Sequence, residues 1–322
     1  MNRKDFKKGH RNNAAVLFKI TSRCNDNCKF CIERRFMRKK REDLSFKEIR
    51  DNFEYLRNNF DLEYVVITGG EPTLHQDFLK IINYFHKEEA EFRVITNLLK
   101  FSDNKFLKRA VPYFLERSND IARENKIIGS INDLPINQVA ARRIMGLKNV
   151  LEYKLTLMLI VVIYKENLGH LPELILYLAG LFKKSHYDKS INIELRLMYI
   201  EGTLKSLLKM SLPTEFGKIK ESVQKAIRVA SSVGITITLW NFPLCYLDKI
   251  PVLLDKTIQE RRQRILLKVN KDFQLRKIQV RDFEEYLKKD RRCSFCKYDV
   301  YCSGIDGLYL SRYHFPPLNP VF

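Results

Sequence analysis

The chain has 322 residues, of which 45% are hydrophobic, and these values are ample for a large buried core. Its longest mostly apolar run, residues 155–163, is far shorter than the roughly 20 residues that a membrane-spanning helix needs, and residues 1–13 are basic and polar, unlike a secretory signal. Seven cysteines, an odd number, fit poorly with a secreted disulfide framework. We therefore expect a cytoplasmic protein with no membrane partner.

The net charge of +20 and the pI of about 9.6 concern the partners of the protein rather than its fold. Two interpretations stay open. The excess of basic residues reflects overall composition, or it attracts an acidic partner: a peptide substrate, RNA, or a low-potential electron donor such as flavodoxin or ferredoxin. The basic residues are dispersed along the chain, and nothing in them specifies nucleic acid.

The first predicted element is a short apolar strand at residues 16–20, and a run of cysteines follows it directly. Cys24, Cys28 and Cys31 have the spacing C-x3-C-x2-C. Iron–sulfur clusters are normally held by four thiolates, so three of them leave one iron open to a substrate or cofactor. The alternative is a zinc knuckle, but no fourth Cys or His follows within the next twenty residues.

The second predicted strand, residues 64–67, ends in a glycine-rich turn. Between the two strands, Ser45 and Glu48 have the spacing of a capping box and open an amphipathic helix that reaches residue 60. The turn reads Thr-Gly-Gly-Glu-Pro and contains Gly69, Gly70, Glu71 and Pro72. Two glycines allow unusual dihedral angles and the close approach of the backbone to a ligand.

Together the cysteine run and the GGEP turn resemble the cluster loop and the second-strand motif of the radical S-adenosylmethionine (SAM) enzymes. The resemblance implies a 4Fe-4S cluster on Cys24, Cys28 and Cys31, whose open iron binds the amino and carboxylate groups of SAM. It also implies reductive cleavage of SAM to a 5′-deoxyadenosyl radical, and contacts of the GGEP turn with the methionine amino group.

The following elements alternate between helix and strand. Strands are expected at 92–96, 126–131, 153–163, 191–199 and 235–240, and helices around residues 78–85 and at 105–115, 137–147, 171–182 and 214–233. This alternation is typical of an α/β protein with a parallel sheet. The resemblance implies a partial (β/α)6 radical SAM barrel, which we assign to residues 1–240.

Further SAM contacts follow from the resemblance at the ends of later strands. Thr96 and Asn97 resemble a Thr-Asn pair below the adenosyl group, Ser130 occupies the place of a ribose-binding hydroxyl, and Arg196 corresponds to an Arg that faces the SAM carboxylate in some relatives. Where many relatives have a glycine soon after the hydroxyl, residues 131–133 read Ile-Asn-Asp. Asn132 or Asp133 is therefore an alternative ribose ligand.

The four remaining cysteines lie in the C-terminal part of the chain. Cys245, Cys293, Cys296 and Cys302 have the spacing C-x47-C-x2-C-x5-C, and four thiolates complete either a zinc site or a closed four-iron cluster. The pattern resembles the SPASM/twitch extension of radical SAM enzymes, which implies an auxiliary 4Fe-4S cluster in a small domain at 241–322. Within it, residues 266–280 are expected to form a hairpin and 282–287 a short helix, both folding around the cluster.

A closed auxiliary cluster has no open iron, so its expected role is electron transfer. This favours net oxidation or cross-linking of a substrate, and the resemblance implies a ribosomally made peptide or a protein side chain. Two alternatives remain: dehydrogenation of a small molecule, and a zinc-containing basic protein that binds nucleic acid without catalysis. The sequence identifies no general acid or base.

Overall fold

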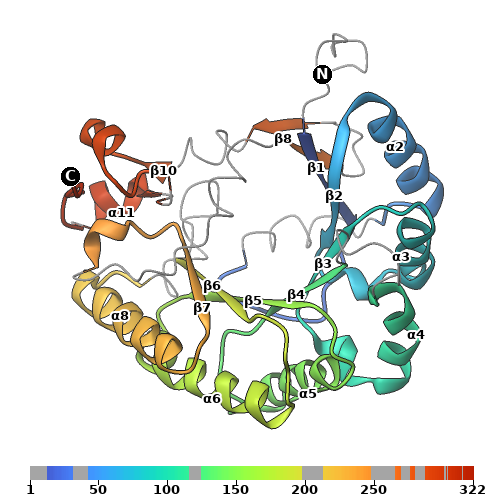
Figure 1. The fold of residues 1–322 in the computed structure, drawn as a ribbon, viewed down its shortest axis with the longest axis horizontal. Coiled ribbons are helices and arrows are strands. Elements are labelled where there is room, and N and C mark those ends of the chain that lie inside the picture. The colour runs from blue at the N-terminus through green and yellow to red at the C-terminus, as the bar shows by residue number, and fades with distance from the viewer. Residues whose placement is uncertain are drawn as a thin grey trace.

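The computed structural model describes residues 13–31, 43–115, 125–197, 213–247, 265–269, 276–279, 287–300, 302, 304–313 and 315–322. In Figure 1 its strands form a curved sheet with helices along the outer side of the curve. The main strands are β1 (Asn13–Thr21), β2 (Asp61–Gly69), β3 (Phe92–Thr96), β4 (Lys126–Ser130), β5 (Leu157–Ile163), β6 (Asn192–Leu197) and β7 (Thr236–Trp240).

The sheet is parallel throughout these seven strands. Its order is β7-β6-β5-β4-β3-β2-β1-β8-β9, so each of β1 to β7 pairs with its neighbours in the sequence. All seven therefore present their carboxyl ends at one edge, which is the edge where open α/β sheets and α/β barrels place their chemistry. The predicted α/β class and the order of elements are confirmed.

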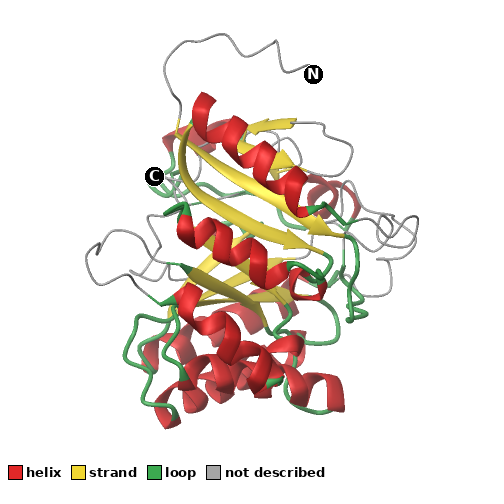
Figure 2. Ribbon diagram, turned by 90° about the vertical axis from the view of Figure 1, so that its right-hand side faces the viewer, coloured by secondary structure: helices red, strands yellow, loops and turns green. Residues whose placement is uncertain are grey.

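Helices cover the outer face of the sheet (Figures 1 and 2). They are α2 (Phe46–Asn59), α3 (Phe78–Lys87), α4 (Asn104–Phe114), α5 (Gln138–Glu152), α6 (Leu171–Lys184) and α8 (Phe216–Ser232). The expected capping box opens α2: the Glu48 amide donates to Ser45 Oγ over 3.2 Å, and the Ser45 amide donates to Glu48 Oε2 over 2.6 Å. The core lies between helices and sheet and includes Phe18, Ile67, Val94 and Leu195.

The boundary between α5 and β5 differs from the expected one. The helix continues to Glu152, five residues further than predicted, and the strand begins only at Leu157. The helix continues because Leu147, Val150 and Leu151 are all buried and extend its apolar stripe at helical spacing. The chain then reverses at Lys154, whose φ of 52° is left-handed.

Beyond β7 the chain contributes to two sheets. β8 (Ile265–Val269) and β9 (Arg276–Gln279) form the expected hairpin, but β8 pairs in parallel with β1 and extends the main sheet. The expectation that this hairpin folds around the C-terminal cysteines is therefore wrong. β10 (Leu287–Lys288) pairs with β11 (Ile305–Asp306), just before α11 (Gly307–Arg312). The predicted helix at 282–287 lies outside the described residues, except for its last residue, which is in β10.

The domain boundary after residue 240 stays a prediction. Across the part of the chain that the structure describes, no helix is both long enough and apolar enough to cross a membrane.

Candidate functional site

The N-terminal cysteines lie on the loop that leaves the carboxyl end of β1. Cys24, Cys28 and Cys31 are all half-buried, and the Cys31 amide donates to the Cys28 carbonyl over 3.2 Å. Burial raises the pKa of the Cys24 thiol to about 11, and it also raises the pKa of Cys28. The charge of Cys31 adds to both shifts. Such thiols become thiolates when a metal supplies compensating positive charge.

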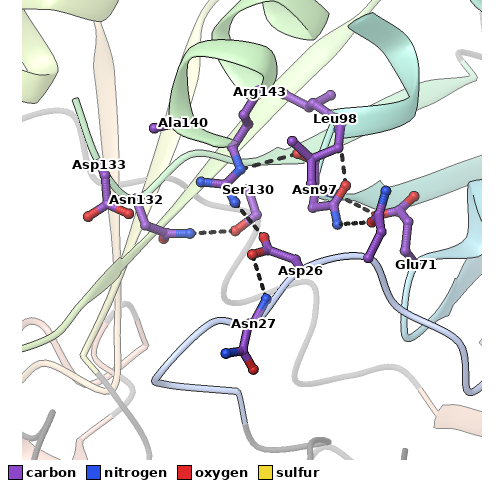
Figure 3. A network of polar contacts seen from close by, with 12 residues as sticks. Asp26, Asn27, Glu71, Asn97, Leu98, Ser130, Asn132, Asp133, Ala140 and Arg143 are labelled. Atoms are coloured by element: carbon purple, nitrogen blue, oxygen red, sulfur yellow. Dashed lines mark hydrogen bonds and ion pairs between the residues drawn. The ribbon is translucent and has the colours of Figure 1, made fainter. Parts of the chain in front are cut away.

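Polar contacts tie this loop to β3 and α5 (Figure 3). Asn97 Nδ2 donates to Asn25 Oδ1 over 2.9 Å, and Arg143 forms an ion pair with Asp26. Arg143 and Asp26 side chains are only 7% and 10% exposed, so this pair is shielded from solvent. The sequence analysis missed both residues. For Arg143 the sequence did offer a signal, because its charge falls within the apolar stripe of the helix, between Ala140 and Leu147.

The same loop also contacts the segment that follows β5. The Phe30 ring lies against the Tyr164 ring with centroids 5.0 Å apart, and Lys29 Nζ lies 2.9 Å from Glu166 Oε1. Tyr164 donates its hydroxyl to Asp133, and burial together with this bond raises the pKa of Tyr164. The cysteine loop is thus held from two sides by protein contacts.

The GGEP turn packs directly on the start of the cysteine loop. The Gly70 amide donates to the Thr21 carbonyl over 2.8 Å, and the Glu71 amide donates to the Arg23 carbonyl over 2.7 Å. Gly69 has a φ of +148°, and a Cβ there would lie 2.2 Å from the Thr21 carbonyl oxygen. Only glycine fits this close approach of the two backbones. Pro72 opens a short 3-10 helix, Pro72–Leu74.

The Glu71 carboxylate is buried and hydrogen-bonded within the protein. Oε1 accepts from Thr73 N (3.2 Å), Thr73 Oγ1 (2.6 Å) and Thr96 Oγ1 (2.8 Å), and Oε2 accepts from Asn97 N (2.6 Å). Burial raises the pKa of Glu71, while these four donors act in the opposite direction. The structure therefore brings Glu71, Thr96 and Asn97 together, with Glu71 bridging β2 and β3.

The predicted ribose ligands lie at the end of β4. Ser130 Oγ accepts from Asn132 Nδ2 over 2.9 Å, and Asn132 Oδ1 accepts from the Val162 amide over 2.7 Å. Asn132 is 2% exposed and joins β4 to β5. Asp133 accepts from Tyr164, as described above.

Arg196 lies on β6 and forms an ion pair with Glu194, two residues earlier on the same face of the strand. Ile193, Leu195 and Leu197 belong to the core between sheet and helices, so Glu194 and Arg196 lie on the other face of the sheet, its concave one. Glu194 is fully buried, and Arg196 is 36% exposed.

A cavity of about 800 Å³ lies beside the cysteine loop. Its lining includes Cys28 and Phe30 from the loop, Asn132 and Asp133 after β4, and Tyr164 after β5. The eight predicted SAM contacts in the GGEP turn and at Thr96, Asn97, Ser130 and Arg196 do not line it, although the structure describes all of them. Both alternative ribose ligands do.

The four C-terminal cysteines border the same small cavity. Cys245, Cys293, Cys296 and Cys302 line one small cavity with Lys289 and Tyr298. Two backbone amides donate to these sulfurs: Val321 N lies 3.3 Å from Cys296 Sγ, and Gly304 N lies 3.4 Å from Cys302 Sγ. Hydrogen bonds of this kind favour a thiolate over a thiol.

Burial raises the pKa values of Cys245 and Cys293. Among the described residues, no three Cys, His, Asp or Glu side chains are gathered tightly enough to hold a single metal ion.

A model of the radical SAM superfamily matches residues 18–178, which is half of the chain. The chain belongs to the radical SAM superfamily. Membership confirms the resemblance drawn from the cysteine spacing and the GGEP turn, both of which lie within the matched residues.

Two curated relatives share parts of this radical SAM chain. An uncharacterized protein of Methanocaldococcus jannaschii is 24% identical over 185 residues, which are 53% of this chain and 60% of that protein. The S-adenosylmethionine-dependent nucleotide dehydratase of Selenomonas ruminantium is 31% identical over 78 residues, which are 24% of this chain and 27% of that enzyme. The chain thus matches less than two thirds of the length of either relative.

Solved structures share the fold over most of the chain. SuiB of Streptococcus suis, bound to S-adenosylmethionine, matches with a TM-score of 0.58 and 14% identity over 94% of this chain and 75% of SuiB. A second SuiB structure, bound to the precursor peptide SuiA, has the same TM-score. The enzyme anSMEcpe, with bound AdoMet and Cp18Cys peptide, matches with a TM-score of 0.57 and 12% identity over 91% of this chain and 88% of that one. The TM-scores show a common fold.

Proposed function

We propose that this radical SAM protein reductively cleaves S-adenosylmethionine with a 4Fe-4S cluster on Cys24, Cys28 and Cys31. The observation that carries the proposal is a loop of three cysteines, held by protein contacts on two sides, with a large cavity at Cys28. The donor set suits a cluster that keeps one iron for a ligand. When bound, such a cluster would supply one electron to SAM, and the resulting 5′-deoxyadenosyl radical would abstract hydrogen from the substrate.

The residues of the chain would bind and orient these groups. The cavity of about 800 Å³ is of a size ordinary for cofactor sites, and it borders both Cys28 and the pair Asn132 and Asp133. This supports binding of the adenosyl part of SAM beside that pair. Gly69, Gly70, Glu71 and Pro72, with Thr96 and Asn97, remain proposed SAM contacts. The Glu71 carboxylate is already satisfied by protein donors, so the backbone groups of the turn would make its contacts.

Ser130 and Arg196 remain proposed SAM contacts, and each already has a protein partner that it would have to share.

The C-terminal cysteines support a second, closed 4Fe-4S cluster of the SPASM/twitch type. Four sulfurs border one cavity and two receive amide hydrogen bonds, which suits a complete thiolate ligand set. A closed cluster would carry electrons rather than bind substrate, so the proposed reaction is a net oxidation or cross-link. The net charge of +20 suits an acidic low-potential donor such as flavodoxin or ferredoxin.

For the substrate we propose a ribosomally made peptide or a protein side chain. The fold is shared with SuiB and anSMEcpe, both of which have been solved with peptides bound. The second candidate is a small molecule, as favoured by the match to a nucleotide dehydratase. The zinc-containing nucleic-acid protein is the weakest candidate, since superfamily membership favours a SAM enzyme.

The test is anaerobic reconstitution of the full chain with iron and sulfide. We expect about eight irons, broad absorption near 400 nm, and release of 5′-deoxyadenosine from SAM after reduction by dithionite. Cys28→Ala should bind about four irons fewer and release no 5′-deoxyadenosine, because the N-terminal cluster loses one of three ligands. Cys296→Ala is the reciprocal control, because all seven cysteines belong to one set or the other. This variant should lose the C-terminal irons and keep the N-terminal ones. A colourless, zinc-containing protein would refute the proposal.

A further inference from the structure

Asp26 sits between two proposed cluster ligands, Cys24 and Cys28, and it is nearly excluded from solvent. Its carboxylate is paired with Arg143 on α5, and the two side chains are 10% and 7% exposed. Burial raises the pKa of the Cys28 thiol, and the negative charge of Asp26 adds to that shift. A buried charge without its partner is strongly destabilising, so the loop needs Arg143 in place to keep Asp26 where it is.

Arg143 also contacts the end of β3. Its Nε donates to the Asn97 carbonyl oxygen over 3.3 Å, while the Asn97 side chain donates to Asn25 in the cysteine loop. The backbone amide of Asn97 in turn donates to the Glu71 carboxylate in the GGEP turn. Figure 3 shows Arg143 pointing from α5 toward Asp26 and Asn97, at the centre of this network.

We propose that Arg143 is a positioning residue that fixes the N-terminal cysteine loop and neutralises the Asp26 carboxylate beside Cys28. The first part concerns the loop itself. The second part rests on the function proposed above: with a cluster on Cys24, Cys28 and Cys31, the net charge of the Arg143–Asp26 pair sets the potential at which that cluster accepts an electron. Charges and hydrogen bonds just beyond the ligands of a metal centre shift its reduction potential in this way.

The first test uses the full chain without iron, so that it does not depend on a cluster. Arg143→Met should raise the rate at which iodoacetamide alkylates Cys28, measured by peptide mass spectrometry, by about tenfold or more, because the loop opens locally. The rate at Cys245 should not change, which separates loop opening from global unfolding. Arg142→Met is the matched control, since Arg142 is the neighbouring residue on the same helix and is exposed.

The second test measures the reduction potential of the N-terminal cluster by EPR. The signal of this cluster is identified as the one that changes when SAM is added. Arg143→Met leaves a negative charge beside Cys28 and should lower the potential, whereas Asp26→Asn leaves a positive charge and should raise it. We expect about a tenfold change in the equilibrium for one-electron reduction, or 59 mV, in each direction. The double variant should return near the wild-type value, and a merely structural role would not give opposite signs.

Arg143→Lys keeps the charge but cannot reproduce both guanidinium contacts, so it should restore the potential and only partly restore protection of Cys28. Equal alkylation of Cys28 in the Arg143→Met and Arg142→Met variants, or shifts of the same sign in Arg143→Met and Asp26→Asn, would overturn the proposal. The two tests can also give different answers. If the wild-type chain binds no cluster, the proposed function is refuted. If Cys28 is nevertheless alkylated faster in Arg143→Met, the positioning role of Arg143 is upheld.

Discussion

Gly69 is the residue at which the backbone of the site leaves no room for a side chain. Its φ of +148° is strained for any other residue, and a Cβ would lie 2.2 Å from the Thr21 carbonyl oxygen. Gly69→Ala should therefore lower the free energy of unfolding by about 3 kcal/mol, from strain and steric overlap together. Urea unfolding of the full chain would measure this loss.

Gly180 provides the matched control for that substitution. It lies within α6, and a Cβ there would meet nothing within 4 Å. Gly180→Ala should stabilise the protein by roughly 0.5–1 kcal/mol, because alanine loses less conformational freedom in a helix. Equal effects of the two substitutions would contradict the close packing of the GGEP turn on β1.

Glu71 is a second residue of the GGEP turn whose contacts can be tested directly. All four of its hydrogen bonds come from protein donors, so Glu71→Gln places an amide N–H against another donor. We expect the apo protein to lose about 1–3 kcal/mol of stability in urea unfolding. If stability is unchanged and only SAM affinity falls, the carboxylate faces the cofactor as the family resemblance first implied.

At the scale of elements, local signals predicted helix starts better than helix ends. Ser45 and Glu48 cap each other at the start of α2. Ser45→Ala removes the acceptor of the Glu48 amide, so it should cost about 1 kcal/mol, measurable as a lowered midpoint of urea unfolding. Ser232→Ala at the end of α8 is a suitable control, because that hydroxyl donates to the Val229 carbonyl within its own helix and caps no helix start. Equal losses in both variants would argue against the capping box.

Helix ends were less predictable, because no sequence signal as specific as the capping box marks them. The end of α5 was placed five residues too early, since a Leu-rich stretch suits a helix and a buried strand equally well. The turn at Lys154 separates α5 from β5, and it contains no glycine or proline from which a turn could be predicted. The hairpin β8–β9 was foreseen, but its pairing with β1 was not, because strand pairing over such a sequence distance leaves no local pattern.

At the scale of the whole molecule, a substitution in one cysteine set should remove the cluster of that set and leave the other cluster in place. In the C-terminal set, Cys245 lies within η5 (Leu244–Tyr246) and Cys293 within η6 (Arg291–Phe295), and the set borders its own cavity. Cys296→Ala should therefore bind about four irons fewer yet still release some 5′-deoxyadenosine, while product formation stops. Iron analysis and product assays after reconstitution would measure these effects. Full turnover by this variant would refute an electron-relay role for the C-terminal cluster.

The sequence by itself determined the α/β class, the order of strands and helices, the two cysteine sets and the GGEP turn, because each depends on short-range spacing that one segment contains. Only the tertiary structure decided how these parts meet: that Glu71 bonds to Thr96 and Asn97, that Arg143 from α5 reaches Asp26, and that β8 joins β1. Such contacts join residues far apart in the chain. They depend on which faces of helices and strands become buried together, and no single stretch of sequence records that choice.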